Sequence, residues 1–196
     1  MAKVFSLQGC MAVGKTTAAQ YIQKNMPQVY VSFEENAAVI KEIAVRQLDK
    51  NIFADYVEIQ KLFIANETER FKKAQLHPYT LMDFGAEEIE FYTLHYPIAV
   101  KKYWPVQQAL QTELKALQAC MPDKILFLEA DAEVLKNRKE ADTLRSRTFF
   151  SYYITHLMPL KKVWFAQKTN VDFLNVSRLT PCQVGCRVQQ WIEANS

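Results

Sequence analysis

The 196-residue sequence predicts an α/β fold, a mostly parallel sheet of five strands with helices on both faces. Two features of the chain predict it. Short apolar segments rich in β-branched and aromatic residues alternate with longer segments of helical periodicity, and parallel strands need helix-length connections. In addition, 49% of the residues are hydrophobic, which is enough to form one core. We therefore expect a single three-layer domain over residues 1–196.

Five apolar segments are the expected strands. The first, VFSL, opens the chain, and Pro27 separates the second, VYVSF, from the helix before it. The fourth has the unbroken apolar centre ILFL, which is typical of a strand buried on both faces. The expected strands cover residues 4–7, 29–33, 79–83, 124–129 and 171–176.

The segments between the strands have helical spacing. Residues 36–75 are expected to form two helices, broken near Asn51. Pro97 is a favoured first-turn residue, so a new helix is expected to begin there. The expected helices cover residues 16–25, 36–75 in two parts, 87–96, 97–120, an aromatic-rich stretch up to about 168, and 180–192.

The segment Gly9–Thr16, GCMAVGKT, carries the most specific pattern in the chain. It matches G-x-x-x-x-G-K-[ST] and lies between an expected strand and an expected helix. In that setting backbone N–H groups and a helix N-terminus converge on phosphate groups. Lys15 would reach the β- and γ-phosphates, and the Thr16 hydroxyl would hold Mg²⁺. The expected nucleotide-binding residues are Gly9, Cys10, Met11, Ala12, Val13, Gly14, Lys15, Thr16 and Thr17.

Carboxylates follow the second and third expected strands. Glu34 and Glu35 come directly after one strand, and Asp83 ends the other. Ligands of open parallel sheets collect beyond these strand ends. A kinase needs one carboxylate there as a base and another to hold Mg²⁺. We expect Glu34, ahead of Glu35, to be the base, with Asp83 as a metal ligand. Alternatively, the glutamates only begin a solvated helix.

Residues 136–147, KNRKEADTLRSR, follow the fourth expected strand and carry five cationic and two acidic side chains. Arginines on a closing segment would offset the charge that builds up on a transferred phosphoryl group. We therefore expect a lid with Arg138, Arg145 and Arg147 as catalytic candidates. The alternative is a solvated helix face.

The helical insert over residues 36–76 offers a surface for an acceptor molecule. Tyr56, Gln60, Phe63 and Arg70 recur at helical spacing. An amide can hydrogen-bond a base edge and aromatic rings can stack on its face, so these residues, with Glu35, are the expected substrate-binding set. The alternative is that the same face belongs to the core.

With these residues in place, the chain resembles P-loop kinases of the nucleoside and nucleotide kinase branch, most of all the deoxynucleoside kinases. The resemblance rests on GCMAVGKTT, on Phe33-Glu34-Glu35-Asn36, on Gln60 and Arg70, and on Leu179-Thr180-Pro181 before the last helix. It implies γ-phosphoryl transfer from ATP–Mg²⁺ to a hydroxyl of a nucleoside, with Glu34 as the base and Gln60 pairing with the nucleobase.

One departure from the family pattern leaves the acceptor open. Where these kinases usually have Asp-Arg-Ser after the third strand, this chain has Asp83-Phe84-Gly85. A nucleoside monophosphate kinase, or a kinase acting on another small hydroxyl compound, therefore stays an alternative. The choice between ATP and GTP as donor also stays open.

A different class of function is a slow NTP-hydrolysing switch or a non-catalytic nucleotide-binding regulator. A GTPase version would lack its base-reading Asn-Lys-x-Asp run, because the closest stretch, residues 167–172, has the sequence QKTNVD. The net charge of +3 is mild and favours no nucleic-acid partner. Neither a long apolar run nor a signal segment is present, so we expect a cytoplasmic protein without a membrane partner. The sequence leaves a homodimer open.

Overall fold

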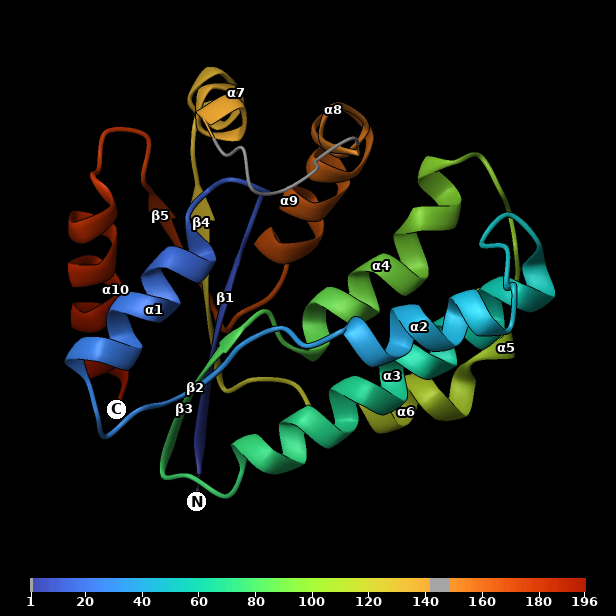
Figure 1. The fold of residues 1–196 in the computed structure, drawn as a ribbon, viewed down its shortest axis with the longest axis horizontal. Helices are drawn as coiled ribbons and strands as arrows, with labels where there is room; N and C mark the ends of the chain where they lie inside the picture. Colours follow the sequence, from blue (N-terminus) through green and yellow to red (C-terminus); the bar gives the residue numbers. More distant parts are fainter. Residues whose placement is uncertain (1, 142–148) are drawn as a thin grey trace.

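The computed structural model describes residues 2–141 and 149–196. At its centre is a five-stranded sheet in which all neighbouring strands run parallel, in the order β2-β3-β1-β4-β5 (Figure 1). The predicted α/β fold class is confirmed, and every strand coincides with a predicted segment to within two residues. The strands are β1 (Lys3–Gly9), β2 (Tyr30–Ser32), β3 (Tyr79–Asp83), β4 (Lys124–Glu129) and β5 (Val171–Asn175).

Helices cover both faces of the sheet (Figure 1). On one face, α1 (Lys15–Asn25) and α10 (Pro181–Asn195) pack side by side. They approach so closely that a Cβ atom on Gly185 would lie 2.3 Å from the Tyr21 ring. The other face is covered by α4 (Ala86–Ala99) and α9 (Met158–Ala166).

The remaining helices extend this second layer and its rim. Next to α4 lies a group of helices, α2 (Ala37–Val45), α3 (Phe53–Ala74), α5 (Val106–Ala109) and α6 (Gln111–Gln118). Following β4 comes α7 (Ala132–Ala141), while α8 (Phe150–Tyr152) and a π-helical turn, η1 (Tyr153–Leu157), lead into α9. The predicted break near Asn51 is confirmed, since α2 ends at Val45 and α3 begins at Phe53.

One helix boundary differs from the sequence prediction. No helix begins at Pro97; α4 instead continues through it to Ala99, and residues 100–105 are not helical. Proline has no N–H, so within a helix it leaves the carbonyl four residues back without its usual donor. The Tyr56 hydroxyl of α3 donates to that carbonyl, the one of Thr93, at 3.0 Å. A contact from another helix thus makes a proline inside α4 tolerable.

The order of the strands fixes where a ligand can bind. The chain runs from β1 to β2 on one side and later crosses to β4 on the other, so β1 marks the point where the strand order reverses. A crevice forms at the carboxyl ends of the strands at such a point. Leu7 of β1 is paired with Asp83 of β3, which brings the end of β3 beside the Gly9–Thr16 loop.

Candidate active site

The glycines of the P-loop have backbone conformations that residues with a side chain rarely adopt. Gly9 has φ +132°, and a Cβ atom there would lie 2.3 Å from the Leu128 carbonyl oxygen of β4. Gly14, with φ +108°, immediately precedes α1. Both conformations fall in the region that favours glycine. The loop therefore turns sharply off β1 and presents its backbone at the N-terminus of α1, the geometry that the motif predicts for phosphate binding.

A cavity of about 1180 Å³ opens directly in front of this loop. Of the nine expected nucleotide-binding residues, eight line it, and Cys10 is buried beneath them. The loop forms only one wall. The cavity is also lined by Glu34 and Asn36 after β2, by Tyr56, Gln60 and Phe63 of α3, and by residues of α4, α7 and α10.

Lys15 is held beneath the loop. Its Nζ donates to the carbonyl oxygens of Gly9 at 3.1 Å and Cys10 at 2.8 Å. Burial and the nearby ammonium group of Lys161 lower the pKa of Lys15 to about 8. An anionic ligand would favour the charged form of this lysine, because opposite charges stabilise each other at short distance.

Thr16 and Asp83 bring two side-chain oxygen donors together at the loop. The Thr16 hydroxyl donates to Asp83 Oδ2 at 2.7 Å. Asp83 is buried, and its Oδ1 has no hydrogen-bond partner among the described residues. A buried carboxylate oxygen without a partner is costly, and hard oxygen ligands suit Mg²⁺, which keeps several waters and takes further ligands from substrate phosphates. The two residues therefore fit a Mg²⁺–triphosphate. Within the described part of the chain, no group of three or more His, Cys, Asp or Glu forms a separate metal site.

Of the two candidate bases, only Glu34 lines the cavity. The Asn36 amide donates to Glu34 Oε1 at 2.6 Å. Glu34 is exposed to solvent within the open cavity, yet desolvation by the surrounding protein, and after it the charges of Glu88 and Asp83, raise the pKa of Glu34 above its ordinary value. Glu35 is exposed too but lies outside the cavity lining, and its backbone carbonyl accepts a hydrogen bond from Asn66 at 3.0 Å.

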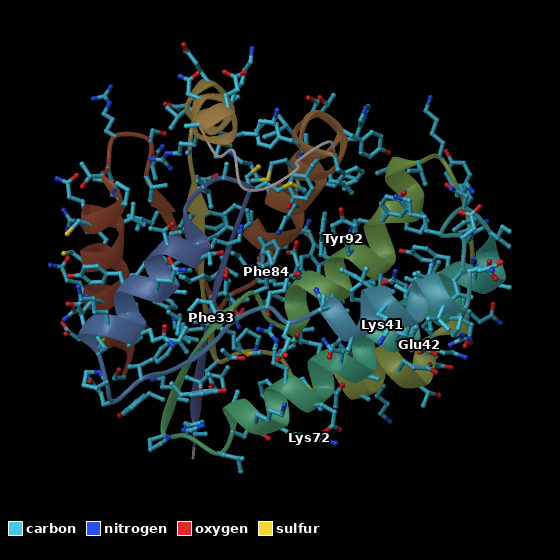
Figure 2. The ribbon with its side chains drawn as sticks, viewed as in Figure 1. Phe33, Lys41, Glu42, Lys72, Phe84 and Tyr92 are labelled. Atoms are coloured by element: carbon cyan, nitrogen blue, oxygen red, sulfur yellow. The ribbon has the colours of Figure 1, made fainter. Side chains whose placement is uncertain are left out.

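The side of the cavity where we expect an acceptor to bind is mainly aromatic. Figure 2 labels Tyr92 on α4 and Phe84 at the end of β3, and both line the cavity. Gln60 is tied to α4, because Thr93 Oγ1 donates to its Oε1 at 2.8 Å. This hydrogen bond uses only the amide oxygen of Gln60, so its two N–H groups can still donate to a ligand. The aromatic side chains on this wall are Tyr56, Phe63, Tyr92, Tyr96, Phe149 and Tyr153.

Arg70 has a place different from the expected one. It does not line the cavity. Its guanidinium forms a two-pronged ion pair with Glu67, at 2.9 and 3.1 Å, and donates to the carbonyl oxygens of Ser32 at 3.1 Å and Phe84 at 2.7 Å. Arg70 therefore joins the ends of β2 and β3, and each of its three guanidinium nitrogens already donates to a protein partner. Its geometry is that of a positioning residue for this edge of the sheet.

Arg138 is the one expected lid arginine within the described residues, and it lines the cavity. From α7 it donates to the Val13 carbonyl oxygen at 3.1 Å and to the Val176 carbonyl oxygen at 2.9 Å. It thus connects the P-loop with the segment after β5. Arg145 and Arg147 lie outside the described residues, so their catalytic role and the lid stay predictions.

Sequence reasoning missed a buried ion pair beside the loop. Lys161 of α9 is fully buried, and its Nζ contacts Glu88 Oε2 of α4 and lies 3.2 Å from the Tyr153 hydroxyl. Both partners line the cavity. A buried lysine needs a carboxylate of this kind. No sequence pattern identified the pair, because 73 residues separate its members.

A second carboxyl group on α4 gives a pH dependence that can be measured. Glu87 is fully buried, and burial raises its pKa above the ordinary value of 4.5, although Ser6 and Gln8 donate hydrogen bonds to it. The folded protein therefore keeps a proton that the unfolded chain loses above about pH 4.5. By linkage, this group makes the free energy of unfolding fall as the pH rises through the folded-state pKa.

Glu87→Gln should remove this contribution, because glutamine keeps an oxygen for Ser6 and Gln8 and carries no charge. At pH 8 the free energy of unfolding of the variant is expected to exceed that of wild type by about 1 kcal/mol or more. The difference between the two proteins should shrink toward pH 5. Denaturant unfolding at both pH values measures it, with exposed Glu42→Gln on α2 as the matched control (Figure 2). Equal stability of Glu87→Gln and wild type at pH 8 would contradict a neutral Glu87.

Comparisons with known proteins give the fold. No protein-family model matches the chain, and no curated protein sequence matches it. Among solved structures, the thymidylate kinase from Candida albicans is similar over 99% of this chain and 92% of its own, with a TM-score of 0.63 and 16% sequence identity. At that identity the likeness shows a shared P-loop fold over nearly the whole chain. No helix in the described part of the chain is long and apolar enough to cross a membrane.

Proposed function

We propose that this protein is a kinase that transfers the γ-phosphoryl group of ATP to a nucleoside monophosphate. One observation carries the proposal: the P-loop, the Thr16–Asp83 pair and a wall bearing Gln60 and aromatic rings all line or border a single cavity. The likeness of the whole fold to a thymidylate kinase supports a nucleotide-like acceptor. We propose ATP–Mg²⁺ as the phosphoryl donor.

Each part of the cavity has a role in the proposed reaction. The loop backbone and Lys15 bind the β- and γ-phosphates, and Thr16 with Asp83 holds Mg²⁺, which supplies charge neutralisation at the phosphates when bound. Arg138 lies beside the loop, where it can add charge to the transferred group. Gln60 would donate its amide hydrogens to the base edge, while Phe63 or Tyr92 stacks on the base.

A deoxynucleoside is the second candidate acceptor, and Glu34 favours it. A nucleoside attacks through a neutral hydroxyl group and needs a base, and Glu34 is the cavity-lining carboxylate after β2. A monophosphate attacks through an oxygen that is already ionised and needs none. The effect of Glu34→Gln therefore distinguishes the two acceptors.

The test combines a panel of acceptors with two variants. Phosphoryl transfer from ATP is measured to the nucleosides, their monophosphates and a set of non-nucleoside alcohols. With a monophosphate, Glu34→Gln should change kcat less than about 10-fold, whereas a nucleoside acceptor should lose roughly 10²–10⁴-fold. Gln60→Leu should change the ranking among bases, because a site built to hydrogen-bond a group discriminates strongly against analogues that lack it.

Two outcomes would overturn the proposal. Transfer to a non-nucleoside alcohol alone would leave a kinase with another acceptor. Binding of ATP without transfer to any compound would favour a switch or a non-catalytic regulator. Glu35→Gln is the matched control, since Glu35 neighbours Glu34 but does not line the cavity.

A further inference from the structure

Phe84 has a backbone conformation that phenylalanine rarely adopts. Its φ is 65°, in the left-handed region. Strain of this kind persists only where the surrounding structure fixes it, and it gathers at functional sites. Phe84 directly follows Asp83, whose carboxylate accepts a hydrogen bond from the Thr16 hydroxyl.

The surroundings hold this conformation from several sides. The Phe84 N–H donates to the Leu7 carbonyl oxygen at 3.3 Å, and its carbonyl oxygen accepts from Arg70 at 2.7 Å. At the next residue, a Cβ atom on Gly85 would lie 2.4 Å from a carboxylate oxygen of Glu87. Neighbouring elements therefore fix the backbone on both sides of Phe84, and with it the point from which the side chain projects.

The ring points to the reaction centre. Its centroid lies 4.8 Å from Lys15 Nζ, so the ring covers the P-loop lysine. Phe84 also lines the cavity that Glu34 and Thr16 line, and Figure 2 labels it at the carboxyl end of the sheet. An aromatic ring at this position offers a cation–π contact and excludes water, and it provides no hydrogen bond to a phosphate.

We propose that Phe84 determines the choice between acceptor and water, by shielding the γ-phosphoryl group from solvent. The inference rests on the proposed kinase function. In the reaction that it suppresses, a water oxygen forms a bond to the γ-phosphorus and the bond to the ADP oxygen breaks. The water protons pass to solvent and phosphate, and the products are ADP and inorganic phosphate. In transfer, an acceptor oxygen takes the place of water.

The experiment measures two rates for each variant of the full chain with ATP–Mg²⁺. One is the release of inorganic phosphate without acceptor, and the other is transfer to the best acceptor of the panel. Phe84→Ala should raise the ratio of hydrolysis to transfer by about 10-fold or more, and Phe84→Leu, which keeps apolar bulk, by less. Phe173→Ala, which removes a phenylalanine from the edge strand β5, should leave the ratio at the wild-type value.

An unchanged ratio in both Phe84→Ala and Phe84→Leu would overturn the inference and leave Phe84 a packing residue. Phe84→Gly gives a third variant that relieves the positive φ, so it keeps the test available if Phe84→Ala does not fold. The failure of the proposed function looks different: wild type would transfer to no compound of the panel. Phosphate release would then still show whether the Phe84 variants admit water.

Discussion

Replacing Lys15 by alanine is expected to lower kcat for phosphoryl transfer by at least about 100-fold, because a preorganised charge at the transferred group is worth about 3 kcal/mol or more in the transition state. Lys15 is buried, and its Nζ has only backbone carbonyl oxygens of the P-loop as hydrogen-bond partners in the described structure. The fold should survive, because the substitution removes a buried charge that forms no direct ion pair with a carboxylate in the described part of the chain.

Steady-state kinetics and thermal unfolding together measure this result. Lys41→Ala is the matched control, because Lys41 is an exposed lysine on α2 (Figure 2). Its kcat should equal that of wild type. If Lys15→Ala keeps the activity of wild type, the P-loop does not act on a triphosphate in this protein. If the variant unfolds at a much lower temperature, loss of activity would reflect the fold and Lys15→Met replaces it in the test.

Asp83→Asn is expected to lower kcat by roughly 10²–10³-fold and to shift the Mg²⁺ dependence of activity to higher concentration. Asparagine keeps the size of the side chain and an oxygen to accept the Thr16 hydroxyl, whose hydrogen bond to Asp83 is 2.7 Å long. The substitution removes the negative charge, part of which lies on the buried Oδ1 that has no partner among the described residues. The change therefore isolates the charge from the packing.

The measurement is a Mg²⁺ titration of transfer, accompanied by ATP binding in the presence and absence of Mg²⁺. Asp131→Asn is the control, because Asp131 is an exposed carboxylate that follows β4 at the same edge of the sheet. A normal Mg²⁺ dependence in Asp83→Asn would remove Asp83 from the metal site.

The sequence predicted the parts of the fold that depend on local signals. The five strands are short apolar segments, and the P-loop motif placed β1, the loop and α1 together. The start of a helix at Pro97 was predicted wrongly, because proline normally ends a run of helical hydrogen bonds. In the folded protein the Tyr56 hydroxyl satisfies the Thr93 carbonyl oxygen, and that partner lies on another helix.

The same distinction between local signals and tertiary packing applies to the candidate site. The cavity position of Glu34 could be predicted because this residue directly follows an expected strand, and ligands of parallel sheets collect beyond the strand ends. The partners of Arg70 and the pairing of Lys161 with Glu88 depend on how α3, α4 and α9 pack. Spacing along the chain identifies residues that share a helix face, but it does not tell whether their donors meet a substrate or a backbone carbonyl.

The central claim is that the γ-phosphoryl group of ATP passes directly to an acceptor bound in this cavity. Phosphorus NMR of one reaction mixture, containing the protein, ATP–Mg²⁺ and a nucleoside monophosphate, tests it most directly. The account predicts that the γ-phosphate signal of ATP declines while the signals of a nucleoside diphosphate from the acceptor grow in equal amount, with no matching rise of inorganic phosphate. Growth of inorganic phosphate alone, with the monophosphate signal unchanged, would contradict it.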